Sequence, residues 1–363
     1  MADYSRSKEL KKFDDTKAGV KGLVDSGIVN VPKMFIRPAD ELAQELIINP
    51  THTNNNNNNQ IPTVDLSGTE AGGSRRKETV DQIKAASKEW GIFQVTNHGI
   101  PLNAMDEMID GVRLFNEQDL GLKREIYSHD TTKTVRFNSY ADLYTSKIAD
   151  WRDTLFLSSF RSDLDPNEIP AVCRNSTMEY VKHIKRLGET LFELLSEALG
   201  LRSDHLGSMG GSKGCSIVCH YYPPCPQPEL TLGLKEHTDP GFLNVLLQNE
   251  IDGLQVLHQC QWLDVHPTRG GLIVNIGDLL QIVSNGKLKS VRHRAVNKNA
   301  GPRITVSSSF SGHVSLLHKT FSPISELTSE PDPPRYKDFV LKEYYARYLS
   351  KSDGKSLTEC YKL

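Results

Sequence analysis

Alternating apolar and polar positions dominate the chain from residue 215 onward. Each alternating segment is short and is followed by turn-forming residues such as Gly, Pro, Asn or Asp. A period of two is typical of a strand with one buried face, and many short strands at this spacing predict two sheets packed as a jelly roll. The expected strands are residues 216–222, 234–239, 242–248, 254–258, 262–265, 272–276, 291–296 and 304–310.

Helical periodicity occupies the first half of the chain and its C-terminal part. Pro101 suits the first position of a helix, and Gly200 is placed to end another. The expected helices are residues 76–89, a helix beginning at Pro101, residues 177–199 and residues 336–349, with an amphipathic stretch at 19–26 and strands at 63–66 and 91–96. The predicted fold class is therefore α+β and mainly β, a double-stranded β-helix (jelly-roll) core flanked by packing helices.

These patterns divide the chain into five consecutive regions. Residues 54–59 are six Asn, a polar tract that cannot form a core and is expected to be a flexible linker. The regions are an N-terminal extension with this linker (1–59), an N-terminal catalytic region (60–165), a packing helix and connection (166–212), the jelly-roll core (213–315), and a C-terminal helix and tail (316–363).

Composition narrows the class of protein. The chain has 363 residues, of which 37% are hydrophobic and 24% charged, as in globular proteins. Its net charge of −2 gives no general attraction to nucleic acid or anionic membrane. No apolar run approaches the ~20 residues of a membrane span, and residues 1–15 lack the apolar core of a secretory signal. Six Cys without a C-x-x-C pair predict reduced thiols. We therefore expect a cytoplasmic protein, a monomer without nucleic-acid or membrane partners.

A His-x-Asp motif is the main candidate for chemistry. His237 and Asp239 lie two residues apart in an expected strand, so their side chains would share a face. His293 lies in another alternating segment and could supply a third ligand. With 12 His in the chain, one such triplet is a weak signal. Two His and one carboxylate, with open positions for other ligands, suit non-haem Fe(II) oxygenases.

A candidate anion site follows the third ligand. Arg303 and Thr305 are two residues apart in the last expected strand, so a guanidinium and a hydroxyl would share a face and could bind a carboxylate. Tyr222, at the end of the first expected strand, offers a further hydroxyl donor.

Six motifs occur in one order along the chain. They are residues 61–66 (IPTVDL), 90–101 (WGIFQVTNHGIP), 221–226 (YYPPCP), 237–241 (HTDPG), 275–278 (NIGD) and 303–305 (RIT). In these motifs the chain resembles the plant 2-oxoglutarate- and Fe(II)-dependent dioxygenases, and among them the branch of 1-aminocyclopropane-1-carboxylate oxidase homologues. Thr305 departs from the pattern, because many relatives have Ser there and the extra methyl would crowd the cosubstrate.

The resemblance implies a set of cofactors and a reaction. Fe(II) would be held by His237, Asp239 and His293, and the distal carboxylate of 2-oxoglutarate by Arg303, with Thr305 and Tyr222 as hydroxyl partners. His220 could contact the keto acid or merely pack. With O₂ as oxidant and ascorbate as reductant, the enzyme would hydroxylate, desaturate or demethylate a plant specialised metabolite and release succinate and CO₂.

The expected substrate pocket continues along the same strand. Period two carries Ser307, Ser309 and Ser311 onto the face of Arg303, and relatives commonly have an aromatic residue near Ser309. A wider and more polar wall is therefore expected. The pocket residues expected are Phe137, Val218, Ser309, Phe310 and Ser311.

Three other functions remain open. An ascorbate-dependent 1-aminocyclopropane-1-carboxylate oxidase would share the iron motif, and succinate formation would distinguish the two. A binding or sensor module could keep the fold without turnover, although an intact His-Asp-His set argues against it. A zinc hydrolase could use the same ligands but would not need Arg303. The identity of the substrate is not readable from the chain.

Overall fold

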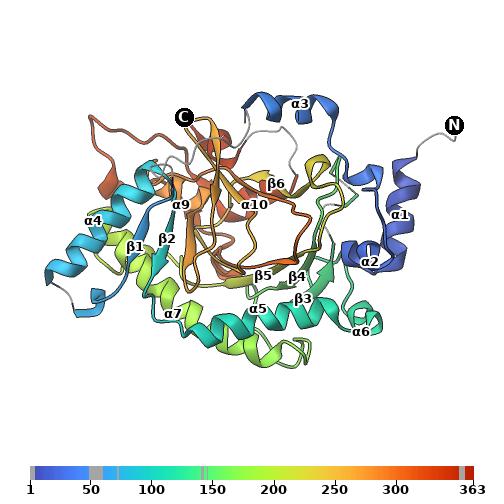
Figure 1. The fold of residues 1–363 in the computed structure, drawn as a ribbon. Coiled ribbons are helices and arrows are strands. Elements are labelled where there is room, and N and C mark those ends of the chain that lie inside the picture. The colour runs from blue at the N-terminus through green and yellow to red at the C-terminus, as the bar shows by residue number, and fades with distance from the viewer. Residues whose placement is uncertain (1–4, 49–59, 72, 140–142, 145, 351–355) are drawn as a thin grey trace.

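The computed structural model describes residues 5–48, 60–71, 73–139, 143–144, 146–350 and 356–363. Two sheets make up its centre, and long helices run along the outer face of the larger sheet (Figure 1). The larger sheet has eight strands and the smaller has four, so the predicted jelly-roll core with packing helices is confirmed.

Strand pairing fixes the order of both sheets. In the larger sheet β1 pairs with β2 in parallel, and the other neighbours pair antiparallel. Its order is β1 (Thr63–Asp65), β2 (Ile92–Thr96), β10 (Leu272–Ile276), β7 (Leu243–Gln248), β12 (Arg303–Phe310), β5 (Cys215–Tyr222), β4 (Asp153–Leu157) and β3 (Val135–Asn138). The smaller sheet has the order β6 (Leu232–His237), β11 (His293–Val296), β8 (Leu254–His258) and β9 (Gln261–Val265).

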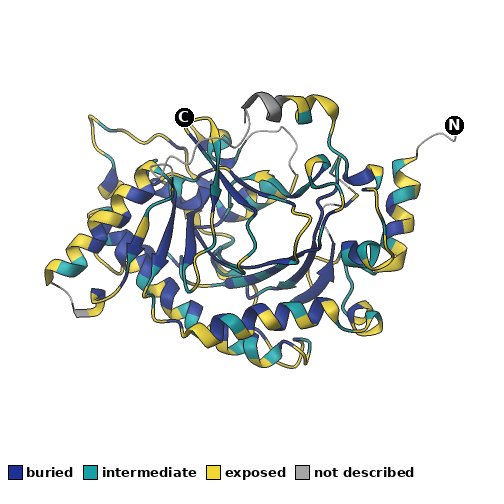
Figure 2. Cartoon of the chain, viewed as in Figure 1, coloured by how far each residue is buried: buried dark blue, intermediate teal, exposed yellow. Residues whose placement is uncertain are grey.

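Amphipathic helices cover the outer face of the larger sheet. The long helix α7 (Arg174–Ala198) and α5 (Leu102–Glu117) bury one side and expose the other, and α4 (Gly73–Glu89) lies beside α7 (Figures 1 and 2). Helix α7 packs closely on the sheet at Gly188, where no side chain larger than hydrogen would fit. A Cβ at this position would lie 2.3 Å from Phe310 Cζ of β12. The helices therefore fill one side of the sheet and leave the other for the site.

The two faces of the larger sheet differ in exposure. On β5 the outer residues Ile217 and Cys219 are buried beneath the helices, whereas Val218 and His220, which face inward, are partly exposed. Ser307 and Ser309 on β12 and Phe156 on β4 follow the same pattern. Partial exposure in the middle of a large sheet means that its inner face borders a hollow. We call the space along this inner face the hollow.

The N-terminal extension packs onto the edge of the larger sheet. It contains α1 (Arg6–Thr16), α2 (Gly19–Asp25) and α3 (Ala39–Ile48), and its apolar side chains form a second core with Trp151 and Cys225. The buried carboxylate of Asp153 on β4 accepts hydrogen bonds from the backbone N–H groups of Val20 and Lys21, both at 2.8 Å. The extension is thus fixed to the strand that also borders the hollow.

Smaller elements complete the described chain. They are α6 (Leu120–Glu125), α8 (His205–Ser208), α9 (Asp278–Val283), α10 (Leu341–Ser350), α11 (Leu357–Tyr361), β13 (Thr320–Phe321), β14 (Phe339–Val340) and short 3₁₀ turns at Lys33–Phe35, Thr69–Ala71, Pro228–Leu230, Val314–Leu316 and Ser325–Leu327.

Several sequence expectations need correction. Strand β6 ends at His237, so Asp239 lies in the following loop and not in the strand. Pro101 is the N-cap of α5 and not its first residue. The C-terminal helix starts at Leu341 instead of residue 336, because Phe339 and Val340 pair with β13. The expected linker at residues 54–59 lies outside the described residues.

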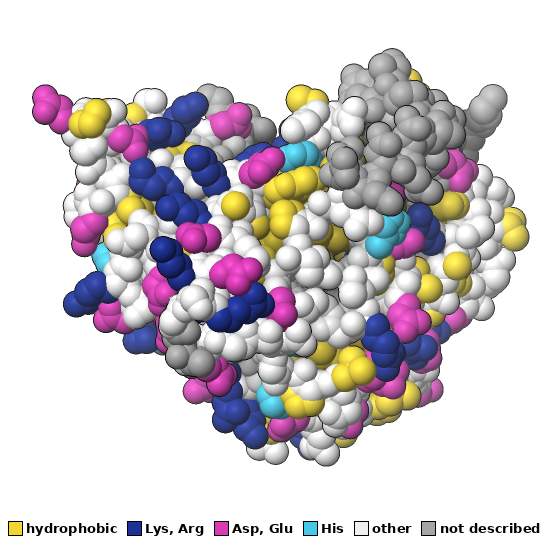
Figure 3. Space-filling model, turned by 60° about the vertical axis from the view of Figure 1, so that its left-hand side comes forward, with side chains coloured by type: hydrophobic (Ala, Val, Ile, Leu, Met, Phe, Trp, Pro, Cys, Tyr) yellow, Lys and Arg dark blue, Asp and Glu magenta, His cyan; other side chains and the backbone are white. Residues whose placement is uncertain are grey.

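Two features of the described surface bear on its character. Among the described helices, none combines the length and apolar character needed to cross a bilayer. On the face drawn in Figure 3, Lys and Arg side chains are interspersed with Asp and Glu. None of the six Cys forms a disulfide.

Candidate active site

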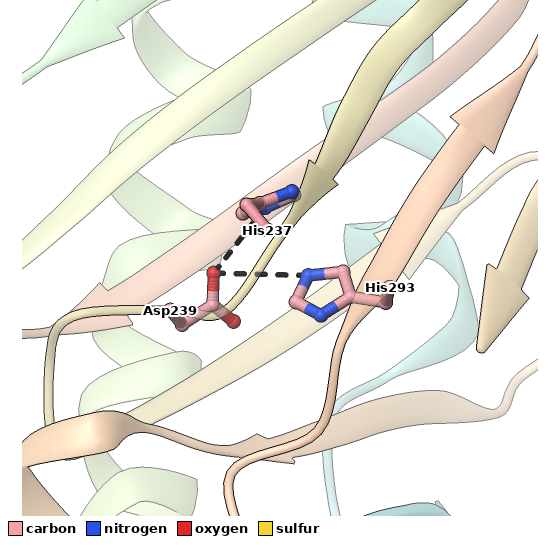
Figure 4. Close-up of side chains that lie close together, drawn as sticks. All are labelled: His237, Asp239 and His293. Atoms are coloured by element: carbon pink, nitrogen blue, oxygen red, sulfur yellow. Dashed lines mark ion pairs between the residues drawn. The ribbon is translucent and has the colours of Figure 1, made fainter. Parts of the chain in front are cut away.

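The three candidate metal ligands meet between the two sheets. His237 is the last residue of β6, His293 is the first residue of β11, and strand pairing sets the two opposite each other. Asp239 reaches the same point from the loop after β6 (Figure 4). One ligand atom from each lies within 4.8 Å of the others, and no other His, Cys, Asp and Glu trio among the described residues does so.

Backbone carbonyls set the tautomer of both histidines. Nδ1 of His237 lies 2.9 Å from the Lys235 carbonyl, and Nδ1 of His293 lies 3.1 Å from the Val291 carbonyl. A carbonyl oxygen can only accept, so each Nδ1 carries the proton and each Nε2 keeps its lone pair. Both Nε2 atoms lie 3.7 Å from Asp239 Oδ1. Each imidazole therefore turns a metal-binding atom to the same place.

Two amides hold the carboxylate of Asp239. Its Oδ2 accepts hydrogen bonds from Asn244 Nδ2 at 3.1 Å and Asn275 Nδ2 at 3.3 Å. Asn244 Oδ1 in turn accepts from Ser307 Oγ at 2.7 Å. Because Oδ2 is occupied, Oδ1 is the oxygen left to face the two imidazoles. The sequence interpretation gave no role to Asn244 or to Asn275 of the 275–278 motif, although a polar residue within an apolar strand such as 243–247 was a usable signal.

Electrostatics keep His237 and Asp239 in the protonation states that bind a cation. Burial, with a further contribution from His293, lowers the pKa of His237 to about 3, so its imidazole is neutral at physiological pH. Burial raises the pKa of Asp239, but the two histidines and the amide donors outweigh it and the net pKa is lowered. Neutral imidazoles and an ionised carboxylate are the forms that coordinate metals.

A buried guanidinium lies at the far end of the inner face. Arg303 is 3% exposed, its Cζ lies 5.1 Å from the ring centre of Tyr222, and its Nη2 donates to Gln248 Oε1 at 3.0 Å. Its Nε is buried without a hydrogen-bond partner among the described residues, and burial lowers its pKa. A buried cation with an unused donor is suited to bind a carboxylate.

Thr305 and His220 lie between this guanidinium and the metal-ligand trio. They are opposite each other on β12 and β5, on the same face as Arg303 and Tyr222. His220 Nδ1 is hydrogen-bonded to Thr154 Oγ1 at 3.1 Å. Burial lowers the pKa of His220 well below its usual value. A neutral His220 therefore borders the space between the two groups.

The expected pocket residues divide between the two faces of the sheet. Val218 and Ser309 face the hollow, and Ser309 Oγ lies 2.9 Å from Ser311 Oγ. Phe137 and Phe310 do not, and this corrects the sequence expectation. Phe137 packs edge-on against Phe115 of α5, and Phe310 packs against Phe192 of α7. Both lie one position out of phase with the inward-facing residues, so period two directs them to the helices.

Comparison with known proteins identifies the family. A model of the 2OG-Fe(II) oxygenase superfamily matches residues 213–311, and one described as the non-haem dioxygenase in morphine synthesis N-terminal matches residues 61–178. A 1-aminocyclopropane-1-carboxylate oxidase homolog of Solanum lycopersicum is 44% identical over 363 residues, covering 99% of this chain and 98% of the relative. The chain belongs to the 2-oxoglutarate- and Fe(II)-dependent oxygenases.

Other members of the 2-oxoglutarate oxygenase family are similar over the same length. Deacetoxyvindoline 4-hydroxylase of Catharanthus roseus is 42% identical over 369 residues, covering 100% of this chain and 91% of the relative. The solved structure of JOX2 in complex with 2OG, Fe and JA has a TM-score of 0.80 at 29% identity, covering 95% of this chain and 97% of that one. The chain is thus a dioxygenase of the plant 1-aminocyclopropane-1-carboxylate oxidase-like branch, whose family uses Fe(II), 2-oxoglutarate and O₂.

The residues present fit the cofactors of a 2-oxoglutarate oxygenase. Two imidazoles and one carboxylate form the two-His, one-carboxylate donor set of non-haem Fe(II) enzymes. The unused buried Nε of Arg303 suits the carboxylate of a keto acid.

Proposed function

We propose that His237, Asp239 and His293 hold Fe(II) and that Arg303, Tyr222 and Thr305 bind the distal carboxylate of 2-oxoglutarate. The observation that carries the proposal is the orientation of the ligand atoms. Both Nε2 atoms and Asp239 Oδ1 face one point, while the second polar atom of each side chain is already hydrogen-bonded. One cation can therefore bind among these three atoms, where the carboxylate of Asp239 would offset part of its charge.

The reaction we propose is the hydroxylation of a small plant molecule, or a related two-electron oxidation such as desaturation or demethylation. When bound, Fe(II) and 2-oxoglutarate would supply oxidative decarboxylation, in which O₂ gives one oxygen atom to succinate as CO₂ is released and the other to the substrate in hydroxylation or to water in desaturation. The chain's own residues position the cosubstrate through Arg303 and seat the substrate in the hollow beside Val218 and Ser309. The relative named deacetoxyvindoline 4-hydroxylase supports hydroxylation as the outcome.

Removing a metal ligand tests the iron assignment. In His293→Ala we expect the bound iron, measured by elemental analysis, to fall to background and 2-oxoglutarate-dependent succinate formation to be lost. The matched control is His266→Ala, which removes an exposed histidine paired with Asp252 at 3.0 Å. Full succinate formation in His293→Ala would contradict the assignment, and equal losses in both variants would attribute the effect to folding.

Arg303→Gln tests the cosubstrate site. Because a charge-assisted hydrogen bond contributes about 1.5–3 kcal/mol, the KM for 2-oxoglutarate should rise at least about tenfold while iron content stays unchanged. Succinate formation also separates this function from an ascorbate-dependent oxidase, which would not consume 2-oxoglutarate. A reduced iron content with an unchanged KM would remove Arg303 from this role.

The substrate can be sought among the small molecules of a plant extract. Incubation of the extract with the enzyme, Fe(II), 2-oxoglutarate and ascorbate as the expected reductant should raise the mass of one compound by about 16 units if the reaction is hydroxylation. Mass spectrometry of the extract, with His293→Ala as the inactive control, makes the measurement.

We further expect a cytoplasmic monomer, which size-exclusion chromatography and localisation of a tagged protein would test.

A further inference from the structure

Another buried arginine, Arg136, faces the hollow from β3, the strand at the edge of the larger sheet. Strand pairing sets Arg136 of β3 opposite Phe156 of β4, Phe156 opposite Val218 of β5, and Val218 opposite Ser307 of β12. Residues directly opposite each other in antiparallel strands share a face, so all four border the same hollow. The row begins at Ser307, whose hydroxyl donates a hydrogen bond to Asn244 beside the metal-ligand trio. It ends at Arg136, at the edge of the sheet.

The guanidinium of Arg136 is buried, and its hydrogen bonds are incomplete. The residue is 7% exposed, and its Cζ lies 4.1 Å from the ring centre of Phe156. Nη1 donates to the Lys133 carbonyl at 3.2 Å, whereas Nε is buried without a partner among the described residues. Among the described residues, no carboxylate forms an ion pair with Arg136. Asp130, the acidic side chain whose charge raises the pKa of Arg136, is exposed.

Two other buried arginines, Arg152 and Arg294, have a side-chain hydrogen-bond partner each. Arg152, also near the hollow, donates to Asp150 at 2.5 Å. Arg294 stacks on Trp262 with its Cζ 4.2 Å from the ring centre, and its Nε donates to Gln255 Oε1 at 2.8 Å. A guanidinium taken out of water without a counter-charge is costly, and an anionic ligand would both neutralise it and use the free Nε–H. Arg136 therefore shares with Arg303 a buried Nε without an acceptor and the lack of an ion pair among the described residues, and Arg303 is already assigned to the cosubstrate.

We propose that Arg136 binds an anionic group of the substrate, a carboxylate or a similar oxyanion, while the carbon to be oxidised lies beside the metal-ligand trio. The inference rests on the proposed function for the position of the reacting carbon. Three strand spacings separate the backbones of Arg136 and Ser307, about 14 Å in all. Since the arginine side chain reaches inward over Phe156, the ligand is an acid with an apolar body roughly 10 Å long, which contacts Phe156 and Val218.

Matched pairs of acids and amides test this inference. The probes are ω-phenylalkanoic acids from phenylacetate to 6-phenylhexanoate, each with its primary amide, added anaerobically to enzyme loaded with Fe(II) and 2-oxoglutarate. Calorimetry then measures binding without turnover. We expect at least one longer acid to bind the wild type about tenfold or more tightly than its amide. Equal affinities of every acid and amide, or binding of no acid, would overturn the inference.

Substitution of Arg136 assigns the preference to this side chain. Arg136→Gln should weaken binding of the acids, leave binding of the amides unchanged and bring their ratio near one, and Arg136→Lys should retain part of the preference. The matched control is Arg294→Gln, because Arg294 is similarly buried and stacked but lies in the smaller sheet. An unchanged acid-to-amide ratio in Arg136→Gln would contradict the proposal, as would loss of the ratio in Arg294→Gln.

Failure of this inference is separable from failure of the proposed function. Arg136→Gln should keep the wild-type iron content and the wild-type KM for 2-oxoglutarate, since neither depends on the substrate's anionic group. If the wild type converts 2-oxoglutarate to succinate but does not prefer acids, only the role of Arg136 is wrong. If the wild type prefers acids but never consumes 2-oxoglutarate, the proposed function is wrong.

Discussion

At the scale of single residues, the arrangement of the candidate metal site depends on groups that do not themselves face the metal position. The carbonyls of Lys235 and Val291 fix the two histidine tautomers, and Asn244 and Asn275 select the oxygen of Asp239 that faces the imidazoles. The sequence supplied the three ligand candidates because His and Asp are distinctive. It did not supply the carbonyls, which are present at every residue, nor the amides, which lie on other strands.

Asn244→Leu tests how far one amide supports the carboxylate. Leucine has a similar shape but removes the donor to Asp239 and leaves the Ser307 hydroxyl without its acceptor. Loss of such a supporting hydrogen bond should weaken Fe(II) binding about 10- to 100-fold. Titration with Fe(II) under anaerobic conditions measures the change. Wild-type affinity in the variant would show that Asp239 is positioned by its loop alone.

At the scale of elements, the strands from β5 to β12 were predictable and β3 and β4 were not. The strands β5 and β12 were expected within a residue, because their outward residues are buried and several of their inward residues are partly exposed, whereas β7 was recognisable as a short, mostly apolar run. In β4 the outward Asp153 is buried by the N-terminal extension, so the alternation is hidden. Helix α1 was not expected because only Leu10 and Phe13 are buried in it.

The contact between α2 and β4 can be tested with two glycines. Gly19 has φ +71° and a Cβ there would lie 2.3 Å from Asp153 Oδ1, whereas Gly27 has φ +77° with nothing within 4 Å. Gly27→Ala should cost about 1–2 kcal/mol of unfolding free energy from backbone strain alone. Gly19→Ala should cost about 1–3 kcal/mol more, because Asp153 must release its backbone donors. Urea denaturation measures both, and equal costs would mean that the close approach relaxes freely.

At the scale of the whole molecule, the extension and the edge of the sheet are connected by a polar cluster. Asp14 of α1 accepts hydrogen bonds from the hydroxyls of Tyr127 and Tyr144, the latter at 2.6 Å, and lies 2.8 Å from His129 Nε2. The cluster lies next to β3, where Phe137 packs against Tyr127. The sequence could not predict this contact, because residues more than 100 positions apart meet in it.

The cluster predicts a pH-dependent contribution to stability. Burial raises the pKa of Asp14, but the hydrogen bonds from Tyr127, Tyr144 and His129 outweigh it, and the net pKa is lowered. A lowered pKa stabilises the folded state above the ordinary Asp value, near 4, and that stabilisation is lost as pH falls through the folded-state pKa. The stability difference between wild type and Asp14→Asn should therefore be present at pH 7 and shrink below about pH 4. Urea denaturation at several pH values measures it, and a constant difference would contradict the prediction.

The placement of Asp153 within β4 also has an evolutionary consequence. Its side chain holds the extension on one face of the strand, while the next residue, Thr154, and then Phe156 border the hollow on the other face. Mutations that shift α2 therefore shift the wall against which a substrate is selected, without replacing any residue of that wall. Selection for a new substrate can consequently act on the N-terminal extension, a segment remote from the chemistry and free of the constraints on the metal ligands.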